Sequence, residues 1–132
     1  MNKVRKITLI TMLIALIIGF TGCYASSTKF SGSKTGNDNQ FLVDFDVLNS
    51  TVNNDMPLTK GETIETTLDI IKGDVDILVE SENGTIAYQG NNVKSGNFTI
   101  EIDETGNYTF YVTGSKAKGS VYFVKSSSDS AN

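Results

Sequence analysis

Two pairs of aspartates come closest to a catalytic or metal-binding arrangement in this chain of 132 residues. Asp44 and Asp46 are two residues apart, as are Asp74 and Asp76, so each pair projects from one face of an extended strand. Paired carboxylates can bind calcium or act as general acid and base. Aspartates also occupy the solvent-facing positions of half-buried strands without any such role, and we favour that interpretation.

Two tyrosines near the C-terminus form the second candidate. Tyr111 and Tyr122 alternate with apolar residues that claim the inner face, so both point outward. If the last two strands form a hairpin that turns at Lys116-Ala117, Tyr111 lies directly opposite Tyr122, with Val124 on the same face. Exposed aromatics on neighbouring strands either form a binding patch or stabilise the strand pair.

The composition excludes several other chemistries. The chain has no His and one Cys, which rules out Ser-His-Asp and Cys-His catalysis, an intrachain disulfide and a Cys/His zinc site. With 11 basic and 15 acidic residues the formal charge is -4, which argues against a nucleic-acid partner. We therefore predict no catalytic residues, no bound metal and no cofactor.

Apolar and polar residues alternate with a period of two along most of the chain after residue 40, which is typical of half-buried β-strands. No window there has the apolar spacing of a helix. The alternating segments are residues 41–48, 64–70, 75–80, 98–102, 108–113 and 121–124. Short turn-rich intervals separate them, so we predict an all-β domain: an antiparallel β-sandwich of about seven strands.

Asn83-Gly84 is the sharpest turn signal, because a two-residue turn needs positive φ at both positions and these residues tolerate it. A hairpin closing there pairs Val79 with Tyr88 and Ser81 with Ile86. This register places Tyr88 and Ile86 on the buried face of the preceding strand.

A short motif follows in the second half of the domain. The segment Glu104-Thr105-Gly106-Asn107-Tyr108 resembles the tyrosine corner of immunoglobulin-like and fibronectin-like Greek-key domains. The resemblance implies that the Tyr108 hydroxyl donates a hydrogen bond to upstream backbone. It also favours two packed antiparallel sheets over a closed barrel.

The N-terminus has the pattern of an export signal. Lys3, Arg5 and Lys6 form a positive head before an apolar run of 14 residues, Ile7 to Phe20. A membrane-spanning helix needs about 20 such residues, whereas a signal peptide uses roughly 7–15. We therefore predict a signal-peptide helix rather than a transmembrane anchor.

The residues after that run are Phe20-Thr21-Gly22-Cys23, which resembles the lipobox of bacterial lipoproteins. The resemblance implies that Cys23 receives a diacylglycerol and becomes the mature N-terminus. It also implies attachment to the extracytoplasmic face of the cell membrane, because two or three acyl chains hold a soluble domain firmly.

The chain then divides into four parts. We predict a lipoprotein signal peptide at 1–22, the lipidated Cys23 with a flexible linker at 23–40, the β-sandwich at 41–125 and a disordered tail at 126–132. Loss of the signal leaves eight basic against 15 acidic residues, a side-chain charge of about -7. Such a surface is repelled by anionic lipid and wall polymers, so we expect the domain to stand off the membrane rather than lie on it.

These features predict a non-catalytic binding or interaction module at the cell envelope, anchored through Cys23, whose partner is an envelope protein or a wall glycan. The alternative is a lipid-anchored hydrolase that uses the paired carboxylates. That alternative predicts a cleft that holds two Asp or Glu with raised pKa, for instance drawn from the four aspartates.

Overall fold

The structure is a computed structural model, and it describes residues 29–126. The predicted signal peptide, the predicted lipidation site Cys23 and residues 127–132 lie outside the described residues. Seven strands follow in order: β1 (Phe30–Gly36), β2 (Gln40–Leu48), β3 (Thr51–Leu58), β4 (Thr63–Ser81), β5 (Ile86–Gly90), β6 (Gly96–Glu101) and β7 (Gly106–Ser126). All pairings are antiparallel, which confirms the predicted fold class. Within residues 29–126 no helix meets the length and hydropathy needed to span a membrane.

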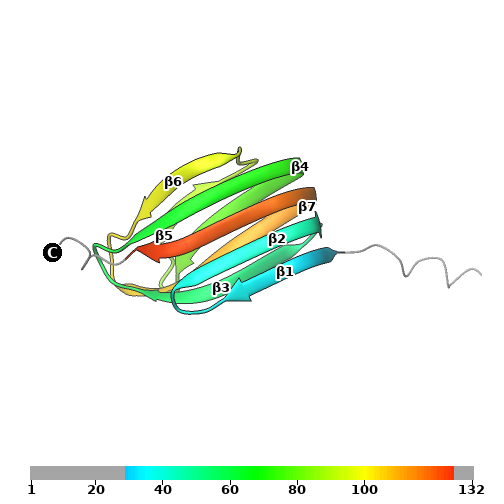
Figure 1. The fold of residues 1–132 in the computed structure, drawn as a ribbon. Helices are drawn as coiled ribbons and strands as arrows, with labels where there is room; N and C mark the ends of the chain where they lie inside the picture. The colour runs from blue at the N-terminus through cyan, green and yellow to red at the C-terminus, as the bar shows by residue number, and fades with distance from the viewer. Residues whose placement is uncertain (1–28, 127–132) are drawn as a thin grey trace, which may run out of the picture.

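Two long strands run through both layers of the sandwich (Figure 1). β4 and β7 pair from Thr63↔Ser126 to Ser81↔Tyr108, with register shifts around Lys72 where both strands bend. The first half of β4 and the second half of β7 belong to the front sheet, in the order β1-β2-β7-β4-β6. Their other halves belong to the rear sheet, in the order β3-β7-β4-β5.

The continuity of β7 contradicts the hairpin predicted at Lys116-Ala117. Both residues lie inside one continuous strand, in which Lys116 has a positive φ (49°). The chain therefore bends there without reversing. Each half of β7 takes its hydrogen-bond partners from β4 and from β2 or β3, so the two halves do not pair with each other.

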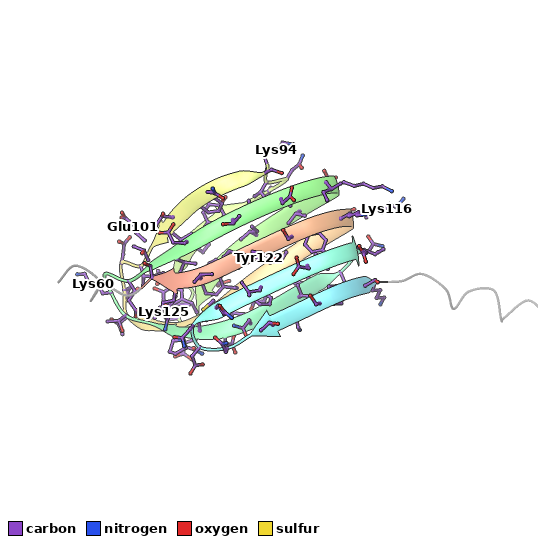
Figure 2. The ribbon with its side chains drawn as sticks, in the orientation of Figure 1. Lys60, Lys94, Glu101, Lys116, Tyr122 and Lys125 are labelled. Carbon is purple, nitrogen blue, oxygen red and sulfur yellow. The ribbon has the colours of Figure 1, made fainter. Side chains whose placement is uncertain are left out.

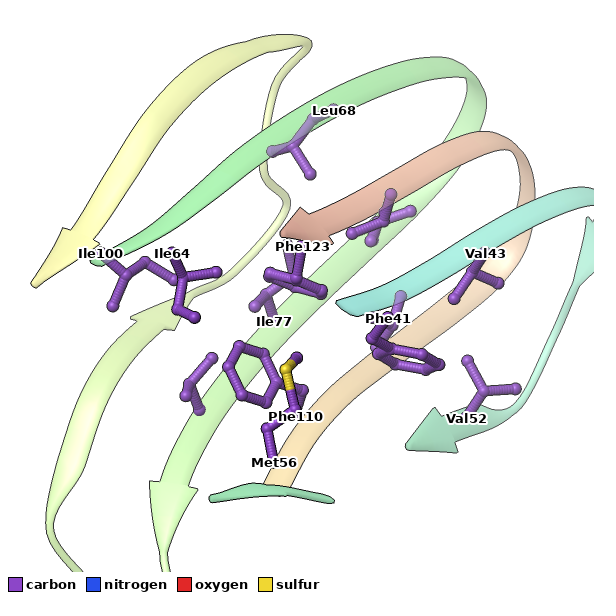
Figure 3. Packing of buried hydrophobic residues seen from close by; sticks show 14 of the residues in the cluster. Phe41, Val43, Val52, Met56, Ile64, Leu68, Ile77, Ile100, Phe110 and Phe123 are labelled. Atoms are coloured by element: carbon purple, nitrogen blue, oxygen red, sulfur yellow. The ribbon is translucent and has the colours of Figure 1, made fainter. Parts of the chain in front are cut away.

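The core lies between the two sheets (Figure 3). It contains inward residues of the predicted alternation, and also Val52, Met56 and Leu58 of β3, which lie outside the predicted segments. Phe123 stacks on Phe41 with 6.2 Å between ring centroids and meets Phe110 edge-on at 4.9 Å. All three rings are fully buried. Since Phe110 belongs to the rear half of β7 and Phe123 to the front half, this cluster ties the two sheets together.

The predicted tyrosine-corner hydrogen bond is present. The Tyr108 hydroxyl donates to the backbone oxygen of Glu104 at 2.6 Å, and the Tyr108 side chain is buried. Burial, and then the charges of Glu104 and Asp103, raise the pKa of Tyr108 above its usual value.

The β4–β5 hairpin has a different turn from the one predicted. Val79 pairs with Tyr88 as expected, but a bulge follows and Ile86 faces Glu80 instead of Ser81. The loop contains three residues, 82–84, because the Ser81 amide donates to the Thr85 carbonyl at 2.8 Å. Gly84 supplies the single positive φ (91°) that such a three-residue loop with a bulge requires. As a consequence Ile86 is 54% exposed rather than buried.

Strand β1 lies within the segment 23–40 that was predicted to be a linker. Six of its seven residues are exposed, so its side chains carry no alternation that the sequence could reveal. Its order comes from backbone pairing with β2 along the edge of the front sheet. The Asn37 side chain closes the connection by accepting hydrogen bonds from the amides of Asn39 (2.8 Å) and Gln40 (3.0 Å).

Candidate binding surfaces

The structure separates the residues of the predicted patch. Tyr122 and Val124 lie on the outer face of the front sheet, whereas Tyr111 lies on the outer face of the rear sheet. The strand partners of Tyr111 are Asn53 and Leu78 rather than Tyr122. A single patch of the three side chains is therefore not formed, because both tyrosines project from one continuous strand that bends between the layers.

The Tyr122 hydroxyl is engaged within the front sheet (Figure 2). It donates to Asp44 Oδ1 at 2.6 Å across the β2–β7 pairing. This hydrogen bond, together with partial desolvation and the Asp44 charge, raises the pKa of Tyr122. Val124, two residues further on, is 40% exposed. The front face thus presents an aromatic ring whose polar end already has a partner.

Tyr111 faces a groove of about 300 Å³ on the rear sheet, which we call the rear groove. Among the described residues, no hydrogen bond engages its hydroxyl. The groove is lined by Thr51, Asp76, Ile77, Leu78, Glu80, Gln89, Asn91, Tyr111 and Thr113. It draws on β3, β7, β4 and β5 and on the residue that follows β5. The sequence identifies Tyr111, but the β4 and β5 residues become its neighbours only through the long β4–β7 pairing.

The polar groups around Tyr111 are held in place by local hydrogen bonds. The hydroxyls of Thr51 and Thr113 are 2.8 Å apart across β3 and β7. Asp76 Oδ1 accepts a hydrogen bond from the Asn92 amide at 2.7 Å, which fixes the loop after β5 against the groove. The site therefore combines a partly exposed aromatic ring with hydroxyl, amide and carboxylate groups at set positions.

The charged side chains that line the rear groove are all acidic. Asp76 and Glu80 line it, and neither lysine nor arginine does. Such a surface disfavours anionic ligands and accepts neutral or cationic ones.

The four aspartates of the hydrolase alternative do not meet in one cleft. Asp44 and Asp46 line a front groove of about 370 Å³ that also contains Asp69, whereas Asp76 lines the rear groove. All four are exposed, and Asp74 lies at the bend of β4. The described residues also contain no cluster of three or more metal-ligating side chains. Two of the four, Asp44 and Asp46, do share a groove, but all four carboxylates are spread over exposed, outward strand positions of the two sheets, which is the arrangement of solvated strand residues.

Comparisons with known proteins assign no family. No family model matches the chain, and no curated protein matches it. Among solved structures, the chain is similar to Aeromonas hydrophila PliG, a periplasmic inhibitor of g-type lysozyme, with 14% identity and a TM-score of 0.45 over 78% of this chain and 91% of that one. It is similar to the pre-peptidase C-terminal domain of Bacillus anthracis collagenase, with 12% identity and a TM-score of 0.45 over 76% and 100%. It is also similar to the C-terminal CBM6 of the laminarinase LamC from Zobellia galactanivorans, with 13% identity and a TM-score of 0.41 over 78% and 94%. These values are too low to place the chain in any of the three groups.

Proposed function

We propose that this chain is a non-catalytic binding module, anchored through lipid on Cys23 to the extracytoplasmic face of the cell membrane, and that its rear groove binds a glycan of the cell wall. The observation that carries the proposal is the position of Tyr111, whose ring lies among polar side chains from β3, β4 and β5.

The chemistry of the groove matches a sugar ring. The apolar face of a pyranose packs on an aromatic ring, and its hydroxyls exchange hydrogen bonds with amides, hydroxyls and carboxylates. Gln89 and Asn91 offer both donors and acceptors, and Asp76 and Glu80 offer acceptors. A volume of about 300 Å³ is at the small end of ligand sites, which suits one or two units of a longer chain.

The charge narrows the class of glycan. Two carboxylates and no basic side chain line the groove, so a neutral or amino-bearing sugar is favoured over a phosphate-bearing wall polymer.

Titration with a soluble N-acetylglucosamine oligomer, followed by calorimetry and NMR, tests the proposal. Replacing Tyr111 by Ala removes the stacking ring and is expected to weaken binding by about fivefold or more, since an aromatic contact is worth about 1 kcal/mol or more. Tyr111→Phe keeps the ring and is expected to bind within about threefold of the wild type. Tyr122→Ala is the matched control on the other sheet. Equal binding by Tyr111→Ala and wild type would refute the assignment.

Lipid attachment is tested separately. Mass spectrometry of the membrane-extracted protein is expected to find a diacylglyceryl group on Cys23 and a chain that begins there. Cys23→Ser is expected to move the protein from the membrane fraction to the soluble exported fraction. A protein that stays in the membrane fraction after this change, uncleaved, is instead held by its apolar N-terminus.

A further inference from the structure

Lysines gather at one end of the sandwich, the end at which β1 begins. Lys29 lies there, and its carbonyl accepts a hydrogen bond from the Asn49 amide at 2.7 Å. The Asn49 side chain in turn accepts from the Lys116 amide at 3.1 Å. Lys72 and Lys118 are strand partners at the bend of β4 and β7.

Lys94 completes the group. Its neighbour Ser95 bonds through its hydroxyl to the Ile70 amide at 2.8 Å, which brings this loop to the bend of β4. Figure 2 shows Lys94 and Lys116 at the same end of the molecule, with Lys60 at the opposite end. We call this region the basic end; its lysines are Lys29, Lys72, Lys94, Lys116 and Lys118. It contains five of the eight lysines in residues 29–126, although the chain as a whole is acidic.

The like charges of the basic end lower the stability of the fold. Lys72 and Lys118 face each other directly, and like charges in that position destabilise a strand pair. Within residues 29–126 the single ion pair joins Lys125 to Glu62, so none of these lysines is neutralised by one. Asp46, Asp69 and Asp74 share this end, but their short side chains stay near the sheet, whereas lysine ammonium groups reach outward.

An apolar side chain lies beside two of these lysines: Ile71 precedes Lys72 in the sequence, and it lines the front groove with Lys118 and with Asp44, Asp46 and Asp69. Ile71 is 64% exposed, the largest exposure among the large hydrophobic residues that the structure describes. It lies between Ile70 and Lys72 at the bend of β4. An exposed aliphatic residue with lysines beside it is suited to contact with a bilayer interface, where the lysines meet anionic headgroups and the aliphatic group enters the acyl boundary.

The covalent chain brings the same end to the membrane. Six residues separate Cys23 from Phe30, the first residue of β1. At no more than about 3.6 Å per residue, they span at most about 25 Å. A lipid on Cys23 therefore keeps the start of β1 near the headgroups, and this step rests on the proposed anchoring.

We propose that the basic end docks on the anionic surface of the membrane, with Ile71 at the interface. Net charge predicts repulsion, but the five lysines turn the domain so that its positive end meets the lipid and its acidic faces point away. The front groove shares Ile71 and Lys118 with this end of the molecule, whereas the rear groove shares no lining residue with the basic end. Docking in this orientation leaves the rear groove open to the wall.

Tryptophan fluorescence tests the orientation, because the chain has no Trp. Ile71→Trp places a reporter at the basic end. Ile86→Trp is the matched control, since Ile86 is 54% exposed on the β4–β5 hairpin at the other end of the rear sheet. The purified full-length lipoprotein is reconstituted in vesicles of brominated phosphatidylcholine, with and without phosphatidylglycerol. We expect quenching of the residue-71 reporter only, and only with phosphatidylglycerol.

A charge variant gives the second readout. Lys72→Gln/Lys118→Gln is expected to lower the ratio of docked to undocked protein by on the order of tenfold. Lys34→Gln/Lys60→Gln makes the same change in net charge away from the basic end and is expected to leave the ratio unchanged. Equal quenching at positions 71 and 86, or quenching that does not depend on phosphatidylglycerol, overturns the docking proposal.

The mass of the purified protein shows whether Cys23 carries a lipid, and so separates a failure of the proposed anchoring from a failure of the docking proposal. If Cys23 carries no lipid, the anchoring in the proposed function fails. The same thiol, the only one in the chain, is then coupled to a maleimide lipid, which supplies the tether chemically. Quenching of the residue-71 reporter in that sample supports docking, and its absence overturns it.

Discussion

Replacing Tyr108 by Phe removes one hydroxyl and leaves a ring that is 1% exposed in the core. The change deletes the 2.6 Å hydrogen bond to the Glu104 carbonyl. Glu104 itself is exposed, so water reaches that carbonyl in part and the loss stays near the net value of a hydrogen bond, about 1 kcal/mol. For a domain of this size, that loss lowers the midpoint of thermal unfolding by about 5 °C.

Urea denaturation followed by circular dichroism measures this loss. Tyr122→Phe is the control, because its hydrogen bond to Asp44 has the same length of 2.6 Å but joins two groups at the surface. We expect that variant to lose less than about 0.5 kcal/mol, since water replaces the tyrosine at an exposed carboxylate. Equal losses in the two variants would refute the reasoning, because burial would then have no bearing on what the corner hydrogen bond contributes.

Three further predictions concern stability. Thr66 is 1% exposed and its hydroxyl has no partner among the described residues, so Thr66→Val is expected to raise the free energy of unfolding by about 1 kcal/mol; a decrease would indicate a bound water. Burial and nearby carboxylates raise the pKa of Tyr108, so the folded chain holds this proton more tightly than the unfolded chain. That contribution is complete below about pH 10 and lost as the pH rises above 10, so stability falls there, and denaturation of Tyr108→Phe should show a shallower fall. A Cβ on Gly119 would lie 2.0 Å from the Asp69 carbonyl, whereas one on Gly96, which has a similar φ, meets nothing within 4 Å. We therefore expect Gly119→Ala to lose at least about 2 kcal/mol more than Gly96→Ala in the same assay; equal losses would contradict the steric reasoning.

The inward-facing residues of the core were predictable because a pleated strand alternates with a fixed period of two. Phe41, Val43 and Ile64 are buried as the pattern predicts, and Thr66 is buried with them. The corner hydrogen bond of Tyr108 was predictable from its local motif, because donor and acceptor are four residues apart.

Features that depend on long-range pairing were not predictable. β1 and β3 lie at sheet edges; the first buries almost nothing, and the second contains Pro57, which an edge strand tolerates. The bend of β4 contains Gly73 and the bend of β7 follows Gly114-Ser115, residue types that also suit turns, so each long strand looks like two. For that reason the sequence predicts that Tyr111 faces Tyr122. In the structure Tyr111 instead lies between β3 and β4.

The central position of β7 has a consequence for biosynthesis. Its second half, which carries Phe123, inserts between β2 and the start of β4, and it is the last part of the domain to be made. A growing or translocating chain therefore cannot close the front sheet until about residue 126 has emerged. Until then the edges of β2 and β4 stay unpaired and the core stays open. The order of strands thus delays folding to the final step of synthesis and keeps the chain in the unfolded form that the proposed export requires.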